Sequence, residues 1–385
     1  MKCKVGVDMH TYAIFSARYT PLTGGVEVYT QNIAHALVKD GNQVHIITCN
    51  LNGLEAHEVQ EDGVEVWRVP SRSLLDGRLP IDIDNSEAKK IYSHLEDVGI
   101  DRVVVNTRFY KHSLVGVKFA DKIGVPCLVI EHGSAHLTLG NSFADKVIEK
   151  YEHRVTEKLK KYDFKLAGVS SAAVSWASHF DIDSSLIVPN AIDVDAFKAN
   201  TSDRDFRDEF GIKEDQTLVV SVGRLCPEKG MDRLACAARL MPKVKFIVAG
   251  AGPLQQEIEE MKLKNFNLVG NLDRSDVCAL LEQADVFCMP TRSEGFSTAL
   301  LEACVMGCIP VMTHVGGVNE IMGNPVKWGV VIDSDVAFEI SEGIYKAISL
   351  SKTSMVDEMS KDIALRCSWD ESVSCLENAF NSFTF

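Results

Sequence analysis

The chain has 385 residues, of which 46% are hydrophobic and 24% charged, and its net charge at pH 7 is −14. This composition is typical of a soluble globular protein, and the length predicts two domains of ordinary size. The acidic balance argues against binding to nucleic acid, and no apolar run approaches the roughly 20 residues of a membrane-spanning helix.

The charge is unevenly distributed along the chain. Residues 1–189 contain 21 Lys and Arg against 24 Asp and Glu, whereas residues 190–385 contain 19 against 30. Any contact with an anionic membrane surface is therefore expected from the N-terminal half. The first residues are typical of a strand and not of a signal peptide, and the 11 cysteines are scattered without a CxxC pair. We expect a cytoplasmic protein with reduced cysteines, with at most peripheral contact at the inner face of the membrane.

Short apolar runs rich in β-branched residues alternate with helical patterns through the first half. Continuous runs of this kind are typical of strands buried on both faces of a parallel sheet. Helices are expected over Gly25–Lys39 and Phe143–Lys161. The expected strands are Lys4–Met9, Gln43–Thr48, Val64–Val69, Arg102–Asn106, Pro126–Glu131, Lys165–Val169 and Leu186–Val188.

The same alternation starts again in the second half, after a polar segment at residues 188–200 that suits a linker. A helix is expected over Ser297–Met306, and Ser368 is a candidate N-cap for a final helix. The expected strands are Leu218–Val222, Lys245–Ala249, Asn267–Val269, Val286–Met289, Pro310–Met312 and Val330–Ile332.

This pattern predicts an α/β protein of two Rossmann-like, doubly wound domains, with the crossing near residues 188–200. Ligands of open α/β sheets bind beyond the carboxyl ends of the strands. Two such domains are expected to face each other across a cleft that holds the ligand.

The strongest local signal is the run Arg292–Glu302, RSEGFSTALLE, which follows an expected strand. Ser297 or Thr298 can begin a helix whose N-terminal N–H groups suit a diphosphate or sugar hydroxyls. Glu302 lies one turn into that helix, where its carboxylate could accept hydrogen bonds from ribose. An isolated pair such as Glu294 and Glu302 would be read as solvated surface, but the strand–turn–helix context favours a binding site.

A second signal, VGRLCPEKG at residues 222–230, also follows an expected strand directly. The first strand-to-helix loop of a Rossmann unit is a common phosphate site. Arg224 and Lys229, flanked by Gly223 and Gly230, could neutralise a leaving diphosphate without a metal. The alternative is an exposed basic loop on an acidic domain.

Two weaker signals lie in the first half. The segment TGGVE at residues 23–27 begins a helix, and Gly24 and Gly25 would allow a phosphate or an acceptor to approach the backbone closely. Because the G-x-G-x-x-G spacing is missing, no dinucleotide cofactor is indicated. The segment EHG at residues 131–133 ends a strand, so His132 could contact a donor hydroxyl or position the acceptor; a structural histidine is the alternative.

We expect no bound metal. The spacing of His132 and His136 resembles a metal pair on a helix, but Gly133 makes a continuous helix through it unfavourable. Several D-x-D tripeptides occur in unrelated turn-like contexts, as is common in a chain with 54 acidic residues. They include Asp82–Asp84, Asp181–Asp183, Asp193–Asp195 and Asp333–Asp335.

Taken together, these segments resemble the retaining family 4 glycosyltransferases, which have the two-domain GT-B fold. The resemblance covers nearly the whole chain, and its most specific part is the run from Ala284 to Ala303. It implies an N-terminal acceptor-binding domain over residues 1–188, a nucleotide-sugar-binding domain over residues 189–367 and a terminal helix at about 368–385 that returns to the first domain. The supporting motifs are GGVE, EHG, VPNAID, VGRLCPEKG, VAGAGP and VGGVNEI.

The resemblance also implies roles for single residues. Arg224 and Lys229 would bind the donor diphosphate and stabilise the leaving group, and Glu294 would bind hydroxyls of the transferred sugar. The amides of Gly295, Phe296 and Ser297 would lie beside that sugar, Thr298 would contact phosphate, and Glu302 would bind ribose. His132 would lie near the donor sugar, Gly24 and Gly25 near phosphate or acceptor, and the base near Gly270, Asn271 and Leu272.

The implied activity is metal-independent transfer of a hexose from a nucleotide-sugar to an acceptor hydroxyl, with retention of configuration. UDP is the first expectation for the nucleotide and GDP the second. A glycan or lipid-linked acceptor, as in envelope polysaccharide synthesis, fits the family by analogy. The alternatives are a nucleotide-sugar epimerase of the same architecture and a non-catalytic subunit that binds a sugar nucleotide.

Overall fold

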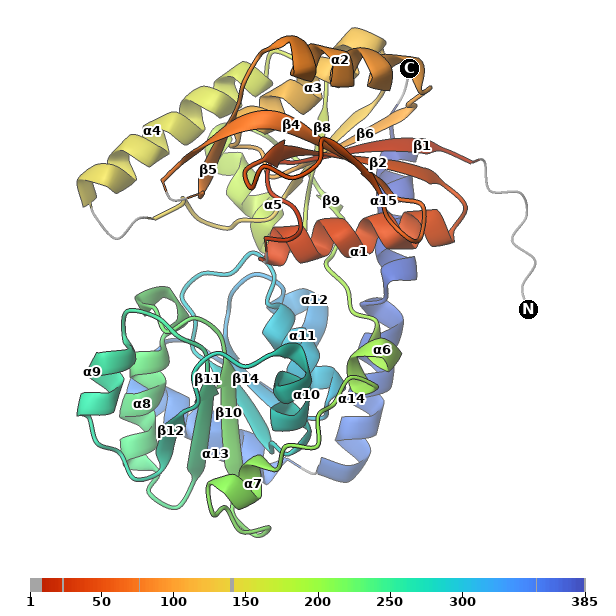
Figure 1. Cartoon of the computed structure of the whole chain (residues 1–385). Coiled ribbons are helices and arrows are strands. Elements are labelled where there is room, and N and C mark those ends of the chain that lie inside the picture. The colour runs from red at the N-terminus through yellow and green to blue at the C-terminus, as the bar shows by residue number, and fades with distance from the viewer. Residues whose placement is uncertain (1–8, 23, 76, 139–141, 351, 384–385) are drawn as a thin grey trace. The chain divides into compact units, whose positions relative to one another are not determined.

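The computed structural model describes residues 9–22, 24–75, 77–138, 142–350 and 352–383. The chain forms two compact units. The first contains residues 1–169, 173–189 and 372–385, and the second contains residues 170–172 and 190–371. Each unit is a mixed α/β structure built on a mainly parallel sheet (Figure 1).

The sheet of the first unit has the order β3-β4-β2-β1-β6-β7-β8-β9, with β5 paired to β4. All its pairings are parallel except those that β3 and β5 make with β4. The strand order therefore changes direction between β1 and β6, which is where doubly wound sheets bind ligands. The strands are β1 (Thr11–Ser16), β2 (Gln43–Asn50), β3 (His57–Val59), β4 (Glu65–Leu74), β5 (Leu79–Asp82), β6 (Arg102–Asn106), β7 (Cys127–Glu131), β8 (Lys165–Gly168) and β9 (Leu186–Ile187).

The first strand differs from the sequence-based expectation. We expected it over Lys4–Met9, of which residues 4–8 lie outside the described residues. The strand in the structure is β1, whose residues from Tyr12 to Ser16 are all buried at the centre of the sheet. Its apolar run TYAIFS has the same character as the run before it, so composition alone did not separate the two.

Helices cover both faces of the first sheet (Figure 1). On one face, α2 and α3 contribute Leu95 and Phe119 to a core that includes Phe15 of β1. On the other face, Phe380 of α15 meets Tyr12 of β1 edge-to-face at 5.9 Å between ring centroids. The helices are α1 (Gly25–Lys39), α2 (Ser86–Asp97), α3 (Lys111–Ile123), α4 (Ser142–Leu159), α5 (Ser171–Ala177), the 3₁₀ turn η1 (Ser178–Phe180) and α15 (Trp369–Asn381).

The sheet of the second unit has six parallel strands in the order β12-β11-β10-β13-β14-β15. This is the strand order of dinucleotide-binding folds, and its direction changes between β10 and β13. The predicted strands of this half are confirmed to within one residue at each end. They are β10 (Leu218–Val222), β11 (Lys245–Ala249), β12 (Phe266–Leu268), β13 (Val286–Met289), β14 (Ile309–Thr313) and β15 (Val330–Ile332).

Helices α8 and α13 pack against each other beside the second sheet, and α10 packs against α11 (Figure 1). All four residues of β13 are buried. Strands buried on both faces consist of continuous apolar runs, which is why they could be predicted from the sequence. The helices are α6 (Val194–Lys198), α7 (Phe206–Glu209), η2 (Pro227–Lys229), α8 (Met231–Leu240), α9 (Gln255–Glu260), α10 (Arg274–Glu282), α11 (Thr298–Val305), α12 (Val318–Met322), α13 (Ala337–Ser349) and α14 (Lys352–Arg366).

The final helix α15 belongs to the first unit through most of its length. Its expected cap is confirmed, because the hydroxyl oxygen of Ser368 accepts the backbone N–H of Glu371 at 3.2 Å. The Ser372 hydroxyl donates to the carbonyl of Pro189 at 2.7 Å, and the guanidinium of Arg102 lies 5.2 Å from the ring centroid of Phe380. These contacts fix α15 on the sheet of the first unit.

Candidate active site

Two loops of the second unit meet where its strand order changes direction. The loop after β10 and the loop after β13 are joined by the carbonyl of Glu228, which accepts the backbone N–H of Arg292 at 2.7 Å and the hydroxyl of Thr291 at 2.9 Å. Gly230 ends the first loop with φ +69°, and a Cβ there would lie 2.2 Å from the carbonyl oxygen of Pro290. A side chain at this position would force the two loops apart, so Gly230 is required for their close approach.

The close approach brings together two residues that the sequence assigned to one site. Lys229 and Glu294 form an ion pair, with side chains 23% and 15% exposed. A hydrogen bond from the Cys226 thiol, together with the charges of Arg224 and Lys229, holds the pKa of Glu228 below its usual value. Arg224 itself is exposed. Both predicted cations therefore lie on the loop after β10, and both lower the pKa of Glu228.

The helix that follows the second loop begins as the sequence predicted. The Ser297 hydroxyl oxygen accepts the N–H of Leu300 at 3.3 Å, so Ser297 is the N-cap of α11 and Thr298 its first residue. Glu302 lies in the second turn, where burial raises the pKa of its carboxyl to about 7 and the charge of Arg274 opposes that rise. A carboxyl group whose pKa lies near neutral pH, on the helix that begins at this loop, suits a polar ligand.

Glycines hold the neighbouring loops of this sheet edge against one another. A Cβ on Gly250 would lie 1.9 Å from the carbonyl oxygen of Gly223, and one on Gly316 would lie 2.2 Å from that of Glu294 and 2.4 Å from that of Gly295. Sequence reasoning named Gly223 and Gly295 but did not assign Gly250 or Gly316 to the site. Gly250 directly follows β11 and Gly316 lies three residues after the end of β14, and these positions were the signal that could have identified them.

The loop after β12 joins the same edge. The N–H of Gly250 donates to the carbonyl of Gly270 at 2.7 Å, which places the following residues Asn271 and Leu272 beside the loop after β11. Asn271 is exposed and Leu272 is partly buried. Phe296, which precedes the N-cap Ser297, is partly buried. Its Cα lies close to Gly317, because a Cβ at that glycine would be 3.2 Å away.

In the first unit, a polar chain runs across the point where strand order changes direction. The Thr30 hydroxyl donates to the Val26 carbonyl at 2.7 Å and accepts from the amide of Asn106 at 2.8 Å. The amide oxygen of Asn106, at the end of β6, lies 3.0 Å from Nε2 of His132. The Val26 carbonyl can only accept, so Thr30 donates to it and Asn106 donates its amide N–H to Thr30. The amide oxygen of Asn106 then accepts from His132, which places the ring proton on Nε2 and leaves the lone pair on Nδ1.

Burial lowers the pKa of His132 to about 3, so its ring is neutral at physiological pH. Tyr29 packs edge-to-face against the ring at 4.8 Å. This arrangement suits a hydrogen-bond acceptor for a hydroxyl and not a general acid, which would need the imidazolium. His132 is therefore still suited to contact a donor hydroxyl, but as a hydrogen-bond acceptor and not as a general acid.

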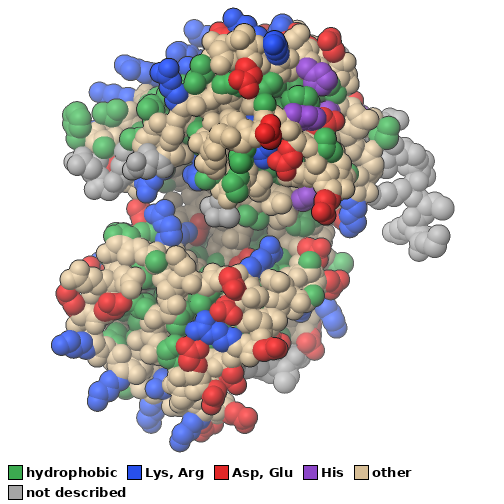
Figure 2. Space-filling model, in the orientation of Figure 1, with side chains coloured by type: hydrophobic (Ala, Val, Ile, Leu, Met, Phe, Trp, Pro, Cys, Tyr) green, Lys and Arg blue, Asp and Glu red, His purple; other side chains and the backbone are tan. Residues whose placement is uncertain are grey.

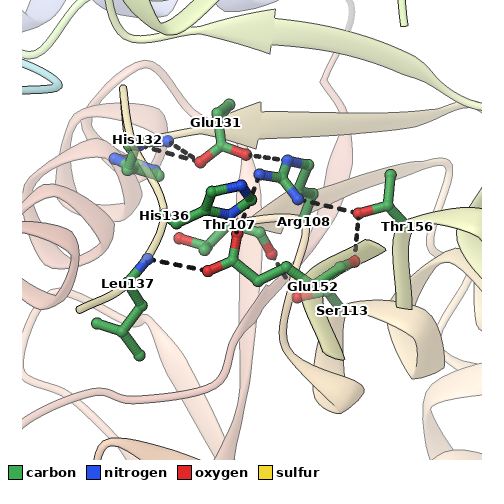
Figure 3. Close-up of polar contacts among 10 residues, drawn as sticks. Thr107, Arg108, Ser113, Glu131, His132, His136, Leu137, Glu152 and Thr156 are labelled. Carbon is green, nitrogen blue, oxygen red and sulfur yellow. Dashed lines mark hydrogen bonds and ion pairs between the residues drawn. The ribbon is translucent and has the colours of Figure 1, made fainter. Parts of the chain in front are cut away.

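Glu131, next to His132, has a structural role. One oxygen of its buried carboxylate accepts the N–H groups of His132 and Gly133, each at 3.0 Å, and the other lies 2.8 Å from Nε of Arg108 (Figure 3). Burial raises the pKa of Glu131, and the charge of Arg108 opposes this. Glu131 and Arg108 therefore hold the loop that presents His132.

The glycine segment of the first unit lies against its own acidic residue. A Cβ on Gly24 would lie 2.3 Å from a carboxylate oxygen of Glu27, whereas one on Gly25 would meet nothing within 4 Å. Glu27 is buried and pairs with Arg18 at 3.0 Å. Gly24 thus makes room for Glu27, and Gly25 alone faces open space as expected for a ligand approach.

The described site residues form two groups, one in each unit. Arg224, Lys229, Glu294, Glu302 and their neighbouring loops share the carboxyl edge of the second sheet. Gly24, Gly25 and His132 lie near the corresponding edge of the first sheet, beyond β1 and β7.

Comparison with known proteins gives matches over most of the chain. The family model "Glycosyltransferase Family 4" matches residues 23–196, and the model "Glycosyl transferases group 1" matches residues 202–363. A solved Anabaena protein, HepE in complex with UDP-glucose, superposes with a TM-score of 0.68 at 14% identity, covering 97% of this chain and 100% of that one. The fold is therefore GT-B.

Two relatives by sequence extend over most of the chain. An uncharacterized glycosyltransferase of Methanocaldococcus jannaschii is 24% identical over 87% of this chain and 88% of its own length. The phosphatidylinositol N-acetylglucosaminyltransferase GPI3 subunit of Saccharomyces cerevisiae is 26% identical over 89% of this chain and 76% of its own length. This chain is a glycosyltransferase and belongs to glycosyltransferase family 4.

No helix among the described residues is both long and apolar enough to cross a membrane.

Proposed function

We propose that the chain transfers a sugar from a nucleotide-sugar to a hydroxyl of a glycan or lipid-linked glycan, with retention of configuration and without a catalytic metal. The observation that carries the proposal is the ion pair of Lys229 with Glu294, with Arg224 on the same loop as Lys229 and Glu302 on the helix that follows Glu294, all at the carboxyl edge of the second sheet. These residues supply two cations, a helix start and two carboxylates, which match a diphosphate, a ribose and a sugar.

The ion pair between Lys229 and Glu294 is the resting arrangement in this proposal. A donor diphosphate carries more charge than one carboxylate, so it draws Lys229 away and is also met by Arg224. Glu294 is then released to accept hydrogen bonds from hydroxyls of the transferred sugar. Negative charge grows on the diphosphate as the sugar leaves, and the two cations stabilise it most at that moment.

Retention follows if the acceptor attacks from the face that the diphosphate leaves. The acceptor oxygen forms its bond to the anomeric carbon as the bond from that carbon to the phosphate oxygen breaks. The acceptor proton passes to the leaving phosphate oxygen. No side chain needs to act as nucleophile, and positioning with charge stabilisation supplies the catalysis.

UDP is the first choice of nucleotide and GDP the second. The choice of UDP is supported by the similar fold of a protein solved with UDP-glucose. The base is proposed to rest near Asn271 and Leu272, on the loop after β12, and the ribose to bind the carboxylate of Glu302.

A lipid-linked acceptor is supported by a relative named for transfer to phosphatidylinositol. It would require contact between the first unit and a membrane surface. Figure 2 shows Lys and Arg side chains gathered over the region of α4. The exposed residues of that helix include Lys146, Lys150 and Arg154 beside the apolar Phe143 and Val147.

We propose that this face of α4 contacts anionic lipid. The chain is expected to sediment with vesicles of phosphatidylglycerol and not with those of phosphatidylcholine. Replacing Lys146, Lys150 and Arg154 by Ser should abolish the sedimentation. Equal binding of the variant would exclude this surface.

The catalytic proposal is tested with a panel of UDP-, GDP- and ADP-sugars in the presence of EDTA. One donor should raise the melting temperature and slowly release free nucleotide without an acceptor. Interconversion of a UDP-sugar with its epimer would replace the proposal with an isomerase. A panel in which nothing binds would support a non-catalytic subunit.

Lys229→Ala should lower turnover with the selected donor by at least about 100-fold, because a charge-stabilising group is lost. The matched control is Lys243→Ala, which removes an exposed lysine of the same unit next to the amino end of β11. Near-normal turnover of Lys229→Ala would contradict the diphosphate assignment.

A further inference from the structure

Three histidines from separate segments of the first unit converge beside α4. His136 follows β7, His153 lies on α4, and His179 lies in η1. Their ring centroids are 5.7, 5.3 and 5.2 Å apart, and one ring nitrogen of each lies within 4.8 Å of the others. The rings are inclined to each other by 49° to 78°, so they converge on one region and do not stack.

Glu152 fixes the orientation of His136. Its carboxylate lies 2.9 Å from Nδ1 of His136 and also accepts the N–H of Leu137 at 2.9 Å (Figure 3). Arg108 lies 3.5 Å from the same carboxylate, which is 1% exposed. A histidine that ligates a metal through one nitrogen commonly donates its other N–H to a carboxylate in this way.

The other nitrogen of His136, Nε2, is buried and has no hydrogen-bond partner among the described residues. Leaving such a group unsatisfied is unfavourable. The nearest acidic atom is an oxygen of Glu149, at 4.0 Å from Nε2. Glu149 precedes His153 by one helical turn, so both side chains lie on the same face of α4.

The spacing of the rings matches a tetrahedral metal site. With metal–nitrogen bonds of about 2.0–2.1 Å, three imidazoles around one Zn²⁺ place their ring centres about 5 Å apart. The observed centroid distances of 5.2 to 5.7 Å are close to this, and small side-chain rotations would close the remaining gap. Glu149 and His153 also line a surface cavity of about 470 Å³ on α4, together with Lys146, Lys150 and Arg154.

Aromatic packing accounts for only part of the cluster. The ring of Trp176 stacks on that of His179 at 4.9 Å with an angle of 8°, which positions His179. It does not explain why the buried Nε2 of His136 has no hydrogen-bond partner among the described residues.

A second cluster contains side chains of metal-ligating types, Cys49, Asp82 and His112, but its histidine has no unsatisfied ring nitrogen. Both ring nitrogens of His112 are occupied, by Asp82 at 2.9 Å and by the carbonyl of Ile47 at 3.0 Å.

We propose that His136, His153 and His179 bind one Zn²⁺ ion, with Glu149 or water as the fourth ligand. The ion would tie the segment after the EHG motif to α4 and η1, and so hold the loop that presents His132. The expectation of no metal came from the pair His132 and His136 and from the D-x-D tripeptides. In the structure these two diverge, His132 to Asn106 and His136 to Glu152, and the other ligands come from distant parts of the chain.

The test uses the full chain without a histidine tag, freed of metal with a chelator and titrated with ZnCl₂ by calorimetry at pH 7.5. One ion per chain should bind and raise the melting temperature. Co²⁺ in place of Zn²⁺ should give the visible absorption of a tetrahedral site. His153→Ala and His179→Ala should each weaken binding at least 10-fold, and their circular dichroism checks that they fold.

The control His35→Ala removes a histidine that pairs with Asp62 elsewhere in the same unit and should bind Zn²⁺ like the wild type. Absence of binding by the wild-type chain would overturn the proposal. So would equal stoichiometry and affinity in a folded His153→Ala, His179→Ala double variant. Lys229→Ala should keep the site intact, so failure of the catalytic proposal and failure of this one are separable.

Discussion

At the scale of single residues, the carboxyl of Glu302 has the property most open to measurement. Burial in the second turn of α11 raises its pKa from 4.5 to about 7, against the opposing charge of Arg274. The folded chain therefore binds this proton more tightly than the unfolded chain does. The corresponding stability is present at low pH and is lost as pH rises from about 4.5 to 7.

We predict that Glu302→Gln flattens this dependence. In the ligand-free wild type, the free energy of unfolding of the second unit should fall across that window by at most about 3 kcal/mol. The variant should lack that fall, as followed by urea unfolding between pH 4.5 and 8. A wild type and a variant with parallel profiles would show that the carboxyl titrates normally.

The same group should make donor binding depend on pH. Only the ionised carboxylate accepts from both ribose hydroxyls, so the affinity for a nucleotide-sugar should rise between pH 6 and 8. A nucleotide-sugar is the suitable probe because its bridged diphosphate does not titrate in this range. Calorimetric titration should show the rise for the wild type and its absence for Glu302→Gln. An equal rise in both would assign it to another group.

At the scale of elements, the buried charges of Arg108, Glu131 and Glu152 join β7 to α4. Arg108 contacts Glu131 at 2.8 Å and Glu152 at 3.5 Å, donates to Thr156 at 2.9 Å, and lies over the ring of Phe180 at 3.4 Å. Each of these side chains is almost completely buried. Removing the cation would leave two carboxylates in the interior without their main partner.

Arg108→Met should therefore destabilise the first unit by about 3–5 kcal/mol, the usual cost of breaking a buried pair. The matched control is Arg154→Met, which removes an exposed arginine of α4. Calorimetric melting should show a large shift for Arg108→Met and little change for the control. Similar shifts in both variants would mean that the buried network contributes no more than surface charge.

The sequence predicted the elements that are buried on both faces, because apolar runs such as Leu218–Val222 and Val286–Met289 leave few alternatives. It missed the short antiparallel strands β3 and β5, whose mixed composition is that of a sheet edge. It did not predict β1, whose apolar run follows the similar run Lys4–Met9, and residues 4–8 of that expected strand lie outside the described part of the chain.

The candidate site was predictable where its residues are close in sequence. Arg224 with Lys229, and Glu294 with Glu302, each lie on one strand-to-helix loop or the helix after it. The backbone contacts of Gly250 and Gly316, and the convergence of His136, His153 and His179, depend on tertiary structure. Such contacts leave no periodic signal in a single sequence.

At the scale of the whole molecule, each unit has its own sheet and its own core. Residues 372–383 return to the first unit, where Phe380 is 4% exposed. The two units should therefore respond separately to a change in α15.

Phe380→Ala should destabilise the first unit by about 3–5 kcal/mol, because a buried aromatic ring is lost from the face of the sheet. The melting of the second unit should be unchanged. Hydrogen exchange resolved by peptide would distinguish the two units, with faster exchange expected in β1 and unchanged exchange in β10. A uniform effect on both strands would contradict the independence of the two cores.

Binding of the donor at the carboxyl edge of the second sheet can be tested by a crystal structure with bound UDP, or with the nucleotide that the donor panel selects. We predict that the diphosphate contacts Arg224 and Lys229, that the ribose hydroxyls contact Glu302, and that the ion pair of Lys229 with Glu294 is open. A nucleotide bound elsewhere on the chain, with that ion pair intact, would show that this edge is not the donor site.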